Sequence, residues 1–196
     1  MRFVLASTSP RRAELLRAAG FAFETVAAAV DERARPGETP PAYVRRLAAE
    51  KSAAVQAALA ADAIILGADT TVVVDGDTLG KPRDDEDSAA MLLRLSGRRH
   101  EVMTGISVRQ GAHESGSVET TSVWFAALTK EDIAWYVASG EGRDKAGAYA
   151  IQGLASRFIP RIEGSYANVV GLPVAAITEL VRSILASRPE TGYSDR

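Results

Sequence analysis

The chain has 196 residues, of which 46% are hydrophobic and 24% charged, the composition of a soluble globular protein with an adequate core. Its net charge of −2 argues against a broad nucleic-acid-binding surface, so a bound polyanion needs a local cluster of basic side chains. There is no cysteine, and the 2 histidines are His100 and His113. This composition excludes disulfides, thiolate metal sites and cysteine nucleophiles, and it leaves too few histidines for a histidine metal cluster.

No segment marks the chain for export or for a membrane. The apolar stretch at residues 1–5 is too short for a signal peptide, and no stretch approaches membrane-spanning length without a charge. We therefore expect a cytoplasmic protein that contacts no membrane.

Strands and helices alternate along the first part of the chain. Residues 3–6 form a predicted strand, and the helix that follows has Ser9 as its N-cap and Pro10 in its first position. A second helix is predicted after Thr39-Pro40-Pro41, ending at about Ala60.

Two further regions have the pattern of strands. Residues 63–68 form an apolar run typical of a central strand, which continues through residues 70–74 to a hairpin signal at Asp75-Gly76. Residues 100–109 and 117–128 are predicted to pair as antiparallel strands.

Three more helices are predicted, and Thr129 with Asp132 forms a capping box at the start of the second. They cover residues 85–95, residues 130–139 and a last segment that carries Ile177, Leu180, Val181 and Ile184. Residues 142–153 and 164–171 are predicted to be loop and turn, and residues 187–196 a frayed tail. The alternation of helices and strands, with an antiparallel pair inserted, predicts an α/β protein: a mixed sheet with flanking helices, in one domain at 1–186.

The first candidate site is the Ser-Thr-Ser-Pro-Arg-Arg turn at residues 7–12, where a strand leads into a helix. Free backbone N–H groups and the helix dipole favour an anion there, and arginine matches phosphate geometry with paired donors. The spaced glycines of a P-loop are missing. The alternative interpretation is a capped helix with solvated arginines.

Acidic side chains at two places could hold a metal or accept a proton. Asp69 lies in a strand-like tract, where a buried carboxylate must be paired, metal-bound or catalytic. Alternatively, the strand reaches solvent before Asp69 and leaves an ordinary surface acid. Together with Asp69, the pair Asp31-Glu32 would suit a hard cation such as Mg²⁺, although acids that precede a charged loop are usually solvated.

Lysine is rare in a chain that otherwise uses arginine, and three of the lysines lie in marked contexts. Lys51 lies on the core-facing stripe of the second predicted helix, so it either snorkels or holds an anion. Lys81 and Lys145 lie in Gly-Lys-Pro and Asp-Lys-Ala-Gly, and a compact ammonium group is a point-charge ligand for phosphate. Lys130 is explained by its place in the first turn of a predicted helix. For Lys51, Lys81 and Lys145 the alternative to a phosphate-binding role is that lysine occurs there by chance.

Gln152 precedes Gly153 in a glycine-containing segment. Its amide offers both a donor and an acceptor, so it can bind the imide edge of a nucleotide base. Glutamine before glycine is also a common turn partner, and alone it decides nothing.

In series, these segments resemble the Maf family of nucleotide pyrophosphatases, in the family's order and from residue 5 to residue 173. The matching segments are Leu5-Ala6-Ser7-Thr8-Ser9-Pro10-Arg11-Arg12, Glu50-Lys51, Gly67-Ala68-Asp69-Thr70, Gly80-Lys81-Pro82, Asp144-Lys145-Ala146-Gly147-Ala148-Tyr149 with Ile151-Gln152-Gly153, and Gly164-Ser165-Tyr166 with Asn168-Val169-Val170-Gly171-Leu172-Pro173. Each segment is weak alone, but the series is highly specific.

The resemblance implies an elongated fold with two lobes around a deep cleft, similar to inosine-triphosphate pyrophosphatases. It also implies a Mg²⁺- or Mn²⁺-dependent reaction on a nucleoside triphosphate that releases the nucleoside monophosphate and pyrophosphate, and a homodimer. Asp69 matches the proton acceptor of the family, and Glu32 a metal-side acid that acts with Asp69. The positions around the triphosphate are Ser9, Arg12, Lys51 and Lys81. The positions tied to the choice of base are Arg11, Thr70 and Gln152.

The residues at the base-choice positions resemble the branch of the family that acts on dTTP and UTP. Two alternatives stay open: the sister branch that acts on 7-methyl-GTP, and a nucleotide-sensing regulator of septum formation that binds without hydrolysis. A proton acceptor beside three lysines favours an enzyme, because a sensor has no need of a base.

Overall fold

The computed structural model describes residues 2–186, and the tail predicted at 187–196 lies outside this range. Within it, seven strands form one mixed sheet in the order β2-β1-β3-β5-β6-β7, with β4 paired to the edge of β3. The strands are β1 (Phe3–Ala6), β2 (Glu24–Thr25), β3 (Ile64–Val74), β4 (Asp77–Leu79), β5 (Arg99–Gln110), β6 (His113–Trp124) and β7 (Arg161–Glu163).

Six α-helices and two short 3₁₀ turns connect the strands of the described chain. They are α1 (Pro10–Ala18), α2 (Pro40–Gln56), α3 (Asp85–Leu95), α4 (Lys130–Ala138), α5 (Tyr166–Val170), α6 (Val174–Ala186), η1 (Ala146–Ala148) and η2 (Leu154–Phe158). The predicted mixed α/β class is confirmed, as is the capping box of Thr129 and Asp132 at the start of α4.

Four predictions differ from the structure, and two of them concern the boundaries of an element. The second helix ends at Gln56, because Ala58 and Leu59 donate to carbonyls only three residues back. Strand β6 starts earlier than predicted, because the polar residues from His113 onward pair with the buried strand β5. It also ends earlier, and the N–H of Ala126 donates to Phe158 O instead of to β5.

The other two differences concern segments predicted without regular structure. Residues 164–171 include the short helix α5, which Ser165 caps by accepting from the Asn168 N–H. Gly171 ends this helix with a φ of 118°, a value that favours glycine. The loop predicted at residues 142–153 contains the single 3₁₀ turn η1.

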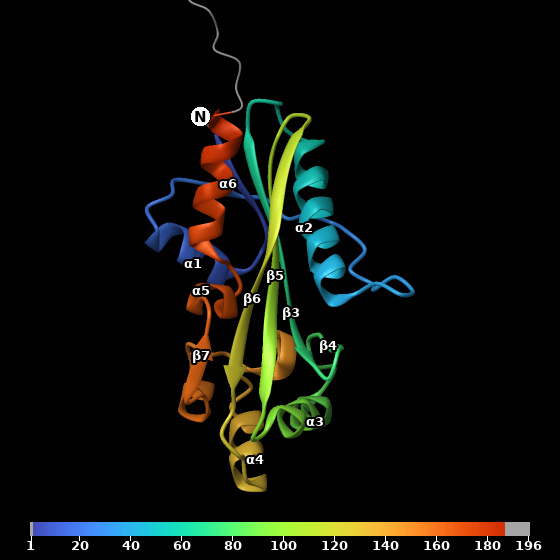
Figure 1. Cartoon of the computed structure of the whole chain (residues 1–196), viewed down its shortest axis with the longest axis vertical. Helices are drawn as coiled ribbons and strands as arrows, with labels where there is room; N and C mark the ends of the chain where they lie inside the picture. The colour runs from blue at the N-terminus through green and yellow to red at the C-terminus, as the bar shows by residue number, and fades with distance from the viewer. Residues whose placement is uncertain (1, 187–196) are drawn as a thin grey trace, which may run out of the picture.

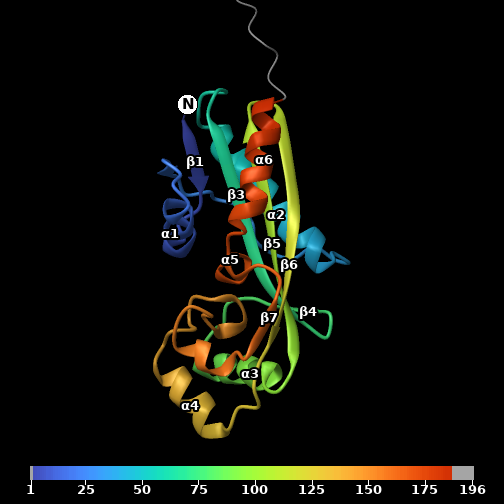
Figure 2. The ribbon, with the colours of Figure 1, turned by 60° about the vertical axis from the view of Figure 1, so that its left-hand side comes forward.

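The molecule is elongated, and the long strands β3, β5 and β6 run through two lobes (Figure 1). In the upper lobe, α1 and α6 cover one face of the sheet and α2 covers the other (Figures 1 and 2). The lower lobe gathers α3, α4, β7 and the 3₁₀ turns around a second core. That core includes Leu92, Val102, Phe125 and Tyr136, whereas Leu5, Leu16, Leu66 and Ile106 belong to the upper one.

Helix α2 lies unusually close to the sheet because two strand residues beneath it are glycines. A Cβ atom on Gly67 would lie 2.1 Å from Ala48 O, and one on Gly105 would lie 2.2 Å from Val44 O. The backbone of α2 therefore rests directly on β3 and β5, which sets how far side chains of α2 reach past the sheet.

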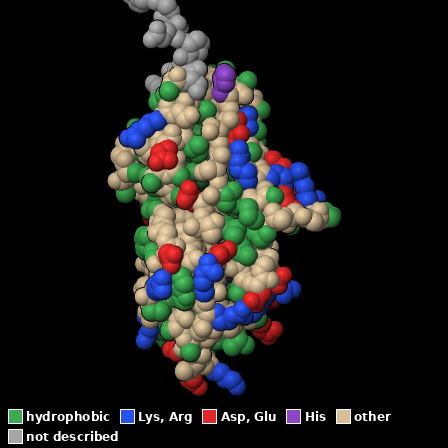
Figure 3. Space-filling view, viewed as in Figure 1, with side chains coloured by type: hydrophobic (Ala, Val, Ile, Leu, Met, Phe, Trp, Pro, Cys, Tyr) green, Lys and Arg blue, Asp and Glu red, His purple; other side chains and the backbone are tan. Residues whose placement is uncertain are grey.

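None of the helices in the described range is both long enough and apolar enough to span a bilayer. On the face drawn in Figure 3, basic and acidic side chains are interspersed over both lobes.

Candidate active site

A cleft of about 520 Å³ lies between the two lobes, where β3 has an open edge. Strand β1 pairs with β3 only as far as Gly67, and β4 begins to pair at Val72. Residues 68–71 therefore have no strand partner on that side. Unlike Asp31, the nine site residues that the family resemblance implies line this cleft: Ser9, Arg11, Arg12, Glu32, Lys51, Asp69, Thr70, Lys81 and Gln152.

The turn from β1 into α1 forms one wall of the cleft. Ser9 has the extended conformation of an N-cap, but its side chain makes no capping hydrogen bond. Ser9 is thus the N-cap and Pro10 the first residue of α1, as predicted, and within the turn Ser7 Oγ accepts the Ser9 N–H. The first N–H groups of α1 and the Ser9 hydroxyl are left beside the cleft, which is the arrangement that favours an anion.

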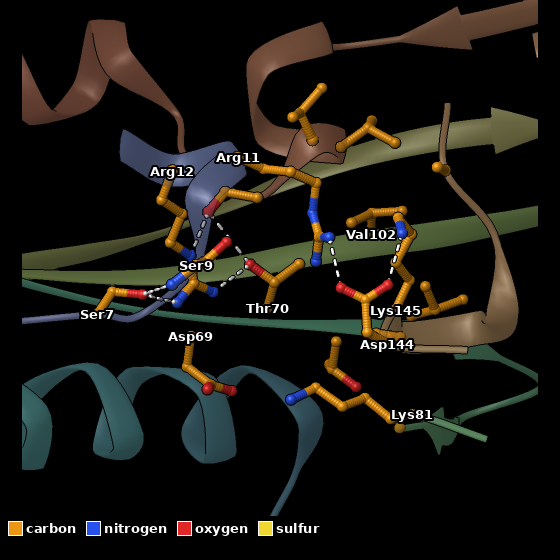
Figure 4. A pocket seen from close by; sticks show the side chains of 18 of the residues that line it. Ser7, Ser9, Arg11, Arg12, Asp69, Thr70, Lys81, Val102, Asp144 and Lys145 are labelled. Atoms are coloured by element: carbon orange, nitrogen blue, oxygen red, sulfur yellow. Dashed lines mark hydrogen bonds and ion pairs between the residues drawn. The ribbon is translucent and has the colours of Figure 1, made fainter. Parts of the chain in front are cut away.

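Arg12 connects three segments that meet at the cleft, and it is not a solvated arginine. Its acceptors are Gly171 O at 2.9 Å, Ala68 O at 2.8 Å, Thr70 Oγ1 at 3.1 Å and Ser7 Oγ at 3.4 Å (Figure 4). Because a guanidinium has five N–H groups, one remains for a ligand. Burial lowers the pKa of Arg12, although the charge of Asp69 opposes that shift.

Asp69 does not reach open solvent, so the surface alternative for this residue is wrong. It lies within β3 with 8% of its surface exposed, beside Lys51, which has the same exposed fraction. Lys51 Nζ lies 2.6 Å from Asp69 Oδ1 and 2.6 Å from Glu32 Oε1. Lys51 therefore holds two carboxylates and does not snorkel to the surface.

The surroundings shift the pKa values of these two carboxyl groups in opposite directions. Burial raises the pKa of Asp69, although Lys51 and Arg12 favour its ionised form. Burial also opposes ionisation of Glu32, but the hydrogen bond and charge of Lys51 hold the pKa of Glu32 below its usual value. The neighbouring Asp31 pairs with exposed Arg33 and is the solvated acid that the alternative interpretation describes.

Asp69 and Glu32 are the two carboxylates of the cleft beside Lys51, and carboxylates are ligands of divalent cations. Within residues 2–186, no group of three or more His, Cys, Asp or Glu side chains could hold a metal ion. Mg²⁺ is usually bound by one or two carboxylates together with waters and substrate phosphates. Asp69 and Glu32 therefore supply the two carboxylates that such a cation takes, and among the described residues they do not form a closed cage.

The lower lobe adds basic side chains on the other side of the cleft. Lys81 extends toward Asp69 (Figure 4) and makes no hydrogen bond or ion pair with any described residue. Lys145 Nζ donates to Asp144 Oδ1 at 2.6 Å, and Arg11 Nη1 donates to Asp144 Oδ2 at 2.9 Å. Lys130, by contrast, lies in the first turn of α4 as predicted.

Asp144 is a cleft residue to which the sequence assigned no role. It joins Arg11 of α1 to Lys145 of the lower lobe (Figure 4). Although burial opposes ionisation, the hydrogen bonds from Lys145 and Arg11 lower the pKa of Asp144 to about 2. The sequence signal for Asp144 is its place in a segment that resembles the Maf family; its partner Lys145 is its neighbour in the chain, whereas Arg11 comes close only in the folded protein.

The residues tied to base choice lie at different depths. The Thr70 hydroxyl accepts from Arg12 and is hydrogen-bonded to Thr104 Oγ1 at 2.9 Å, so it faces the protein. The Gln152 side chain is exposed in the cleft and makes no hydrogen bond with the part of the chain that the structure describes. Gln152 is therefore free to meet a ligand directly.

Comparisons with known proteins agree with this architecture. A family model described as "Maf-like protein" matches residues 2–184. A dTTP/UTP pyrophosphatase of Anaeromyxobacter sp. (strain Fw109-5) is 52% identical over 92% of this chain and 88% of its own length. A protein of the same name from Vibrio cholerae is 49% identical, over 92% and 96%, and one from Escherichia coli O157:H7 is 48% identical, over 97% and 97%.

Solved structures resemble this one in fold. The Ham1 protein of Staphylococcus aureus has a TM-score of 0.54 at 16% identity and covers 94% of this chain, and 100% of that chain is covered. A HAM1 protein of Coxiella burnetii has a TM-score of 0.51 at 14% identity, with 95% and 100% covered. At such identities the likeness concerns the fold alone. The family model and the close relatives, each matching nearly the whole chain, show that this protein belongs to the Maf family.

Proposed function

We propose that this protein is a nucleoside triphosphate pyrophosphatase that hydrolyses dTTP and UTP to the monophosphate and pyrophosphate. The observation that carries the proposal is one buried carboxylate, Asp69, in a cleft lined by five basic side chains. These are Arg11, Arg12, Lys51, Lys81 and Lys145. The names of the close relatives support the choice of substrate.

The triphosphate lies over the start of α1 in this proposal. The Ser9 hydroxyl and the first N–H groups of the helix bind phosphate oxygens, and the last free N–H group of Arg12 adds a donor. Lys81 provides a positive charge from the opposite lobe, where no protein group competes for it among the described residues. Lys51 of α2 provides a further positive charge in the cleft.

Asp69 accepts the proton of the attacking water. As the water oxygen bonds to the α-phosphorus, the bond from that phosphorus to the oxygen bridging to the β-phosphorus breaks, and pyrophosphate leaves. A divalent cation, Mg²⁺ or Mn²⁺, held by Asp69 and Glu32 would neutralise part of the phosphate charge. Lys51 holds the carboxylates of Asp69 and Glu32 on the same side of the cleft, where they would bind the cation. Lys81 stabilises the negative charge that develops on the leaving pyrophosphate.

Gln152 binds the base. Its amide can accept from N3–H and donate to O4 of thymine or uracil, a pattern that cytosine reverses, because its N4 amino group donates and its N3 accepts. Arg11 shapes the same side of the cleft through its ion pair with Asp144. Thr70 acts indirectly, because its hydroxyl holds Arg12.

A substrate panel tests this proposal. Phosphate release with Mn²⁺ and added inorganic pyrophosphatase is measured for dTTP, UTP, CTP and 7-methyl-GTP. Turnover of dTTP and UTP well above the others is expected. A preference for 7-methyl-GTP assigns the protein to the sister branch, and tight nucleotide binding without turnover makes it a sensor.

We further propose that the protein works as a homodimer in the cytoplasm, where its nucleotide substrates are found. Light scattering coupled to size exclusion measures the mass directly. A mass equal to one chain contradicts the dimer and leaves the proposed reaction untouched.

A further inference from the structure

The turn that carries Gln152 is fixed from behind by two side chains at the end of α4. Tyr136 Oη accepts the N–H of Ala150 at 3.0 Å, and Glu141 Oε1 accepts the N–H of Leu154 at 2.9 Å. The two side chains are joined to each other, because Tyr136 Oη donates to Glu141 Oε2 at 2.7 Å. One connected pair therefore holds the backbone on both sides of Gln152.

The turn itself is tight. The N–H of Gly153 donates to Ala150 O at 3.1 Å, which places Gln152 between two bonded backbone groups. A Cβ atom on Gly153 would lie 2.0 Å from Glu141 Oε1. Glycine at this position therefore lets the Glu141 carboxylate lie directly against the turn.

The pair is anchored in the lower lobe. The ring of Tyr136 is 1% exposed and makes an edge contact with Phe158, with 6.2 Å between the ring centroids. Neither Tyr136 nor Glu141 lines the cleft, so neither can touch a bound nucleotide. Their effect on a ligand has to pass through the position of the turn.

We propose that Tyr136 and Glu141 are positioning residues for base selection, which they achieve by fixing the direction of the Gln152 amide. This inference rests on the proposed pyrophosphatase function. Discrimination by hydrogen bonds depends on donor and acceptor geometry, so a turn free to shift loses more affinity for the matching base than for a mismatched one. Within the described residues, none of the proposed phosphate-binding groups Ser9, Arg12, Lys51 and Lys81 is hydrogen-bonded to Tyr136 or Glu141, so phosphate binding is expected to change little.

Tyr136→Phe tests the proposal, because it removes the hydroxyl and keeps the ring. The measurement is kcat/KM for UTP and for CTP, with melting temperature alongside. We expect kcat/KM for UTP to fall by about tenfold, which corresponds to the free energy of about one hydrogen bond, whereas kcat/KM for CTP should change much less. The UTP-to-CTP ratio therefore falls.

A role that is merely structural would lower stability and leave this ratio unchanged. Thr129→Ala is the matched control, because it removes the capping box at the other end of α4 without touching the turn. It is expected to lower the melting temperature and to keep the wild-type ratio.

Two further variants keep the test decisive if Tyr136→Phe folds poorly. Gly153→Ala displaces the Glu141 carboxylate without changing α4, and should lower the ratio as Glu141→Ala does. Glu141→Gln keeps a polar atom near both Tyr136 Oη and the Leu154 N–H, so its UTP-to-CTP ratio should stay closer to the wild-type ratio than that of Glu141→Ala.

The outcomes separate this inference from the proposed function. A wild-type enzyme that prefers UTP, with the same ratio in Tyr136→Phe, Gly153→Ala and Glu141→Ala, overturns the positioning role alone. A wild-type protein that hydrolyses no triphosphate, or hydrolyses all of them equally, overturns the proposed function and this inference together.

Discussion

Lys51 is the residue on which the two acids of the cleft depend. Its Nζ lies 2.6 Å from both Asp69 Oδ1 and Glu32 Oε1, and about nine-tenths of the lysine is shielded from solvent. Removing a partner from a buried charge leaves that charge uncompensated, so changes at this position affect both carboxylates at once.

Asp69→Asn removes the proposed base and keeps the size and shape of the side chain. We expect kcat to fall by about 10²- to 10⁴-fold, because the amide cannot take the proton of the attacking water. KM should change little, since the phosphate-binding groups remain. Steady-state kinetics with UTP and Mn²⁺ measures both, and near-normal turnover would remove the assignment of Asp69 as base.

Lys51→Gln should move the acid limb of the pH profile to higher pH. Burial already raises the pKa of Asp69, and the positive charge of Lys51 partly opposes that shift. Without this charge the pKa of Asp69 rises further, so the ionised base is lost at a higher pH as the solution is acidified. The logarithm of kcat/KM against pH locates the limb. An acid limb at an unchanged pH in the variant contradicts the coupling.

His100 makes the stability of the fold depend on pH. Burial lowers its pKa from 6.5 to about 4, and its Nε2 lies 2.8 Å from Tyr149 Oη. A depressed pKa gives stability that is complete above pH 6.5 and is lost as the pH falls toward about 4. The loss attributable to this one residue should approach about 3 kcal/mol.

Urea unfolding at pH 7.5 and pH 4.5 measures this loss, with His100→Gln as the control. Glutamine does not titrate and can still bond to Tyr149. The drop in unfolding free energy between the two pH values should therefore be smaller in the variant by about 2 to 3 kcal/mol. An equal drop in both proteins would assign the acid sensitivity to other groups.

At the scale of elements, the distance between α2 and the sheet decides whether Lys51 reaches Asp69. Two strand glycines permit that distance, since a Cβ on Gly67 or Gly105 would overlap backbone atoms of the helix. Glycine inside a strand usually destabilises it, but here the two glycines allow the backbone of α2 to pack directly against β3 and β5.

Gly67→Ala should therefore destabilise the fold by at least about 2 kcal/mol, because the helix backbone has to move away from the sheet. Activity should fall as well, since Lys51 moves with the helix. Gly80→Ala is the control, because a Cβ there meets nothing within 4 Å. It is expected to change stability by less than about 0.5 kcal/mol. Chemical denaturation of the two variants makes the comparison, and equal stability would show that α2 tolerates the displacement.

At the scale of the molecule, the cleft is built from both lobes, so a bound nucleotide connects them. Ser9 and Arg12 belong to the upper lobe and Lys81 to the lower one (Figure 4), and Gln152 lies between the 3₁₀ turns η1 and η2 of the lower lobe. A ligand that binds only this folded arrangement stabilises it by mass action.

A UTP analogue with a methylene group between its α and β phosphates should therefore raise the melting temperature. At a hundred times its Kd it adds about 2.7 kcal/mol, or about 5 to 10 °C for a chain of this size. Lys81→Ala should show a clearly smaller shift at the same concentration, and Asp69→Asn should keep it. A full shift in Lys81→Ala would show that this lysine does not bind the phosphates.

The sequence by itself determined the class of the fold and predicted residues that line one cleft. The alternation of strands and helices predicted a mixed sheet, and the segments resembling the Maf family contain the candidate residues of the cleft except Glu32. These features depend on local periodicity and on residue identity, which a linear chain displays directly.

Only the tertiary structure decided which side chains face one another. It showed that Asp69 is buried, that Lys51 lies between two acids and that Asp144 joins the lobes through Arg11 and Lys145. Apart from the neighbours Asp144 and Lys145, the partners of these contacts are separated in the sequence, and their distances depend on how closely α2 and the two lobes pack. No local pattern records that packing, because burial and distance are properties of the whole folded chain.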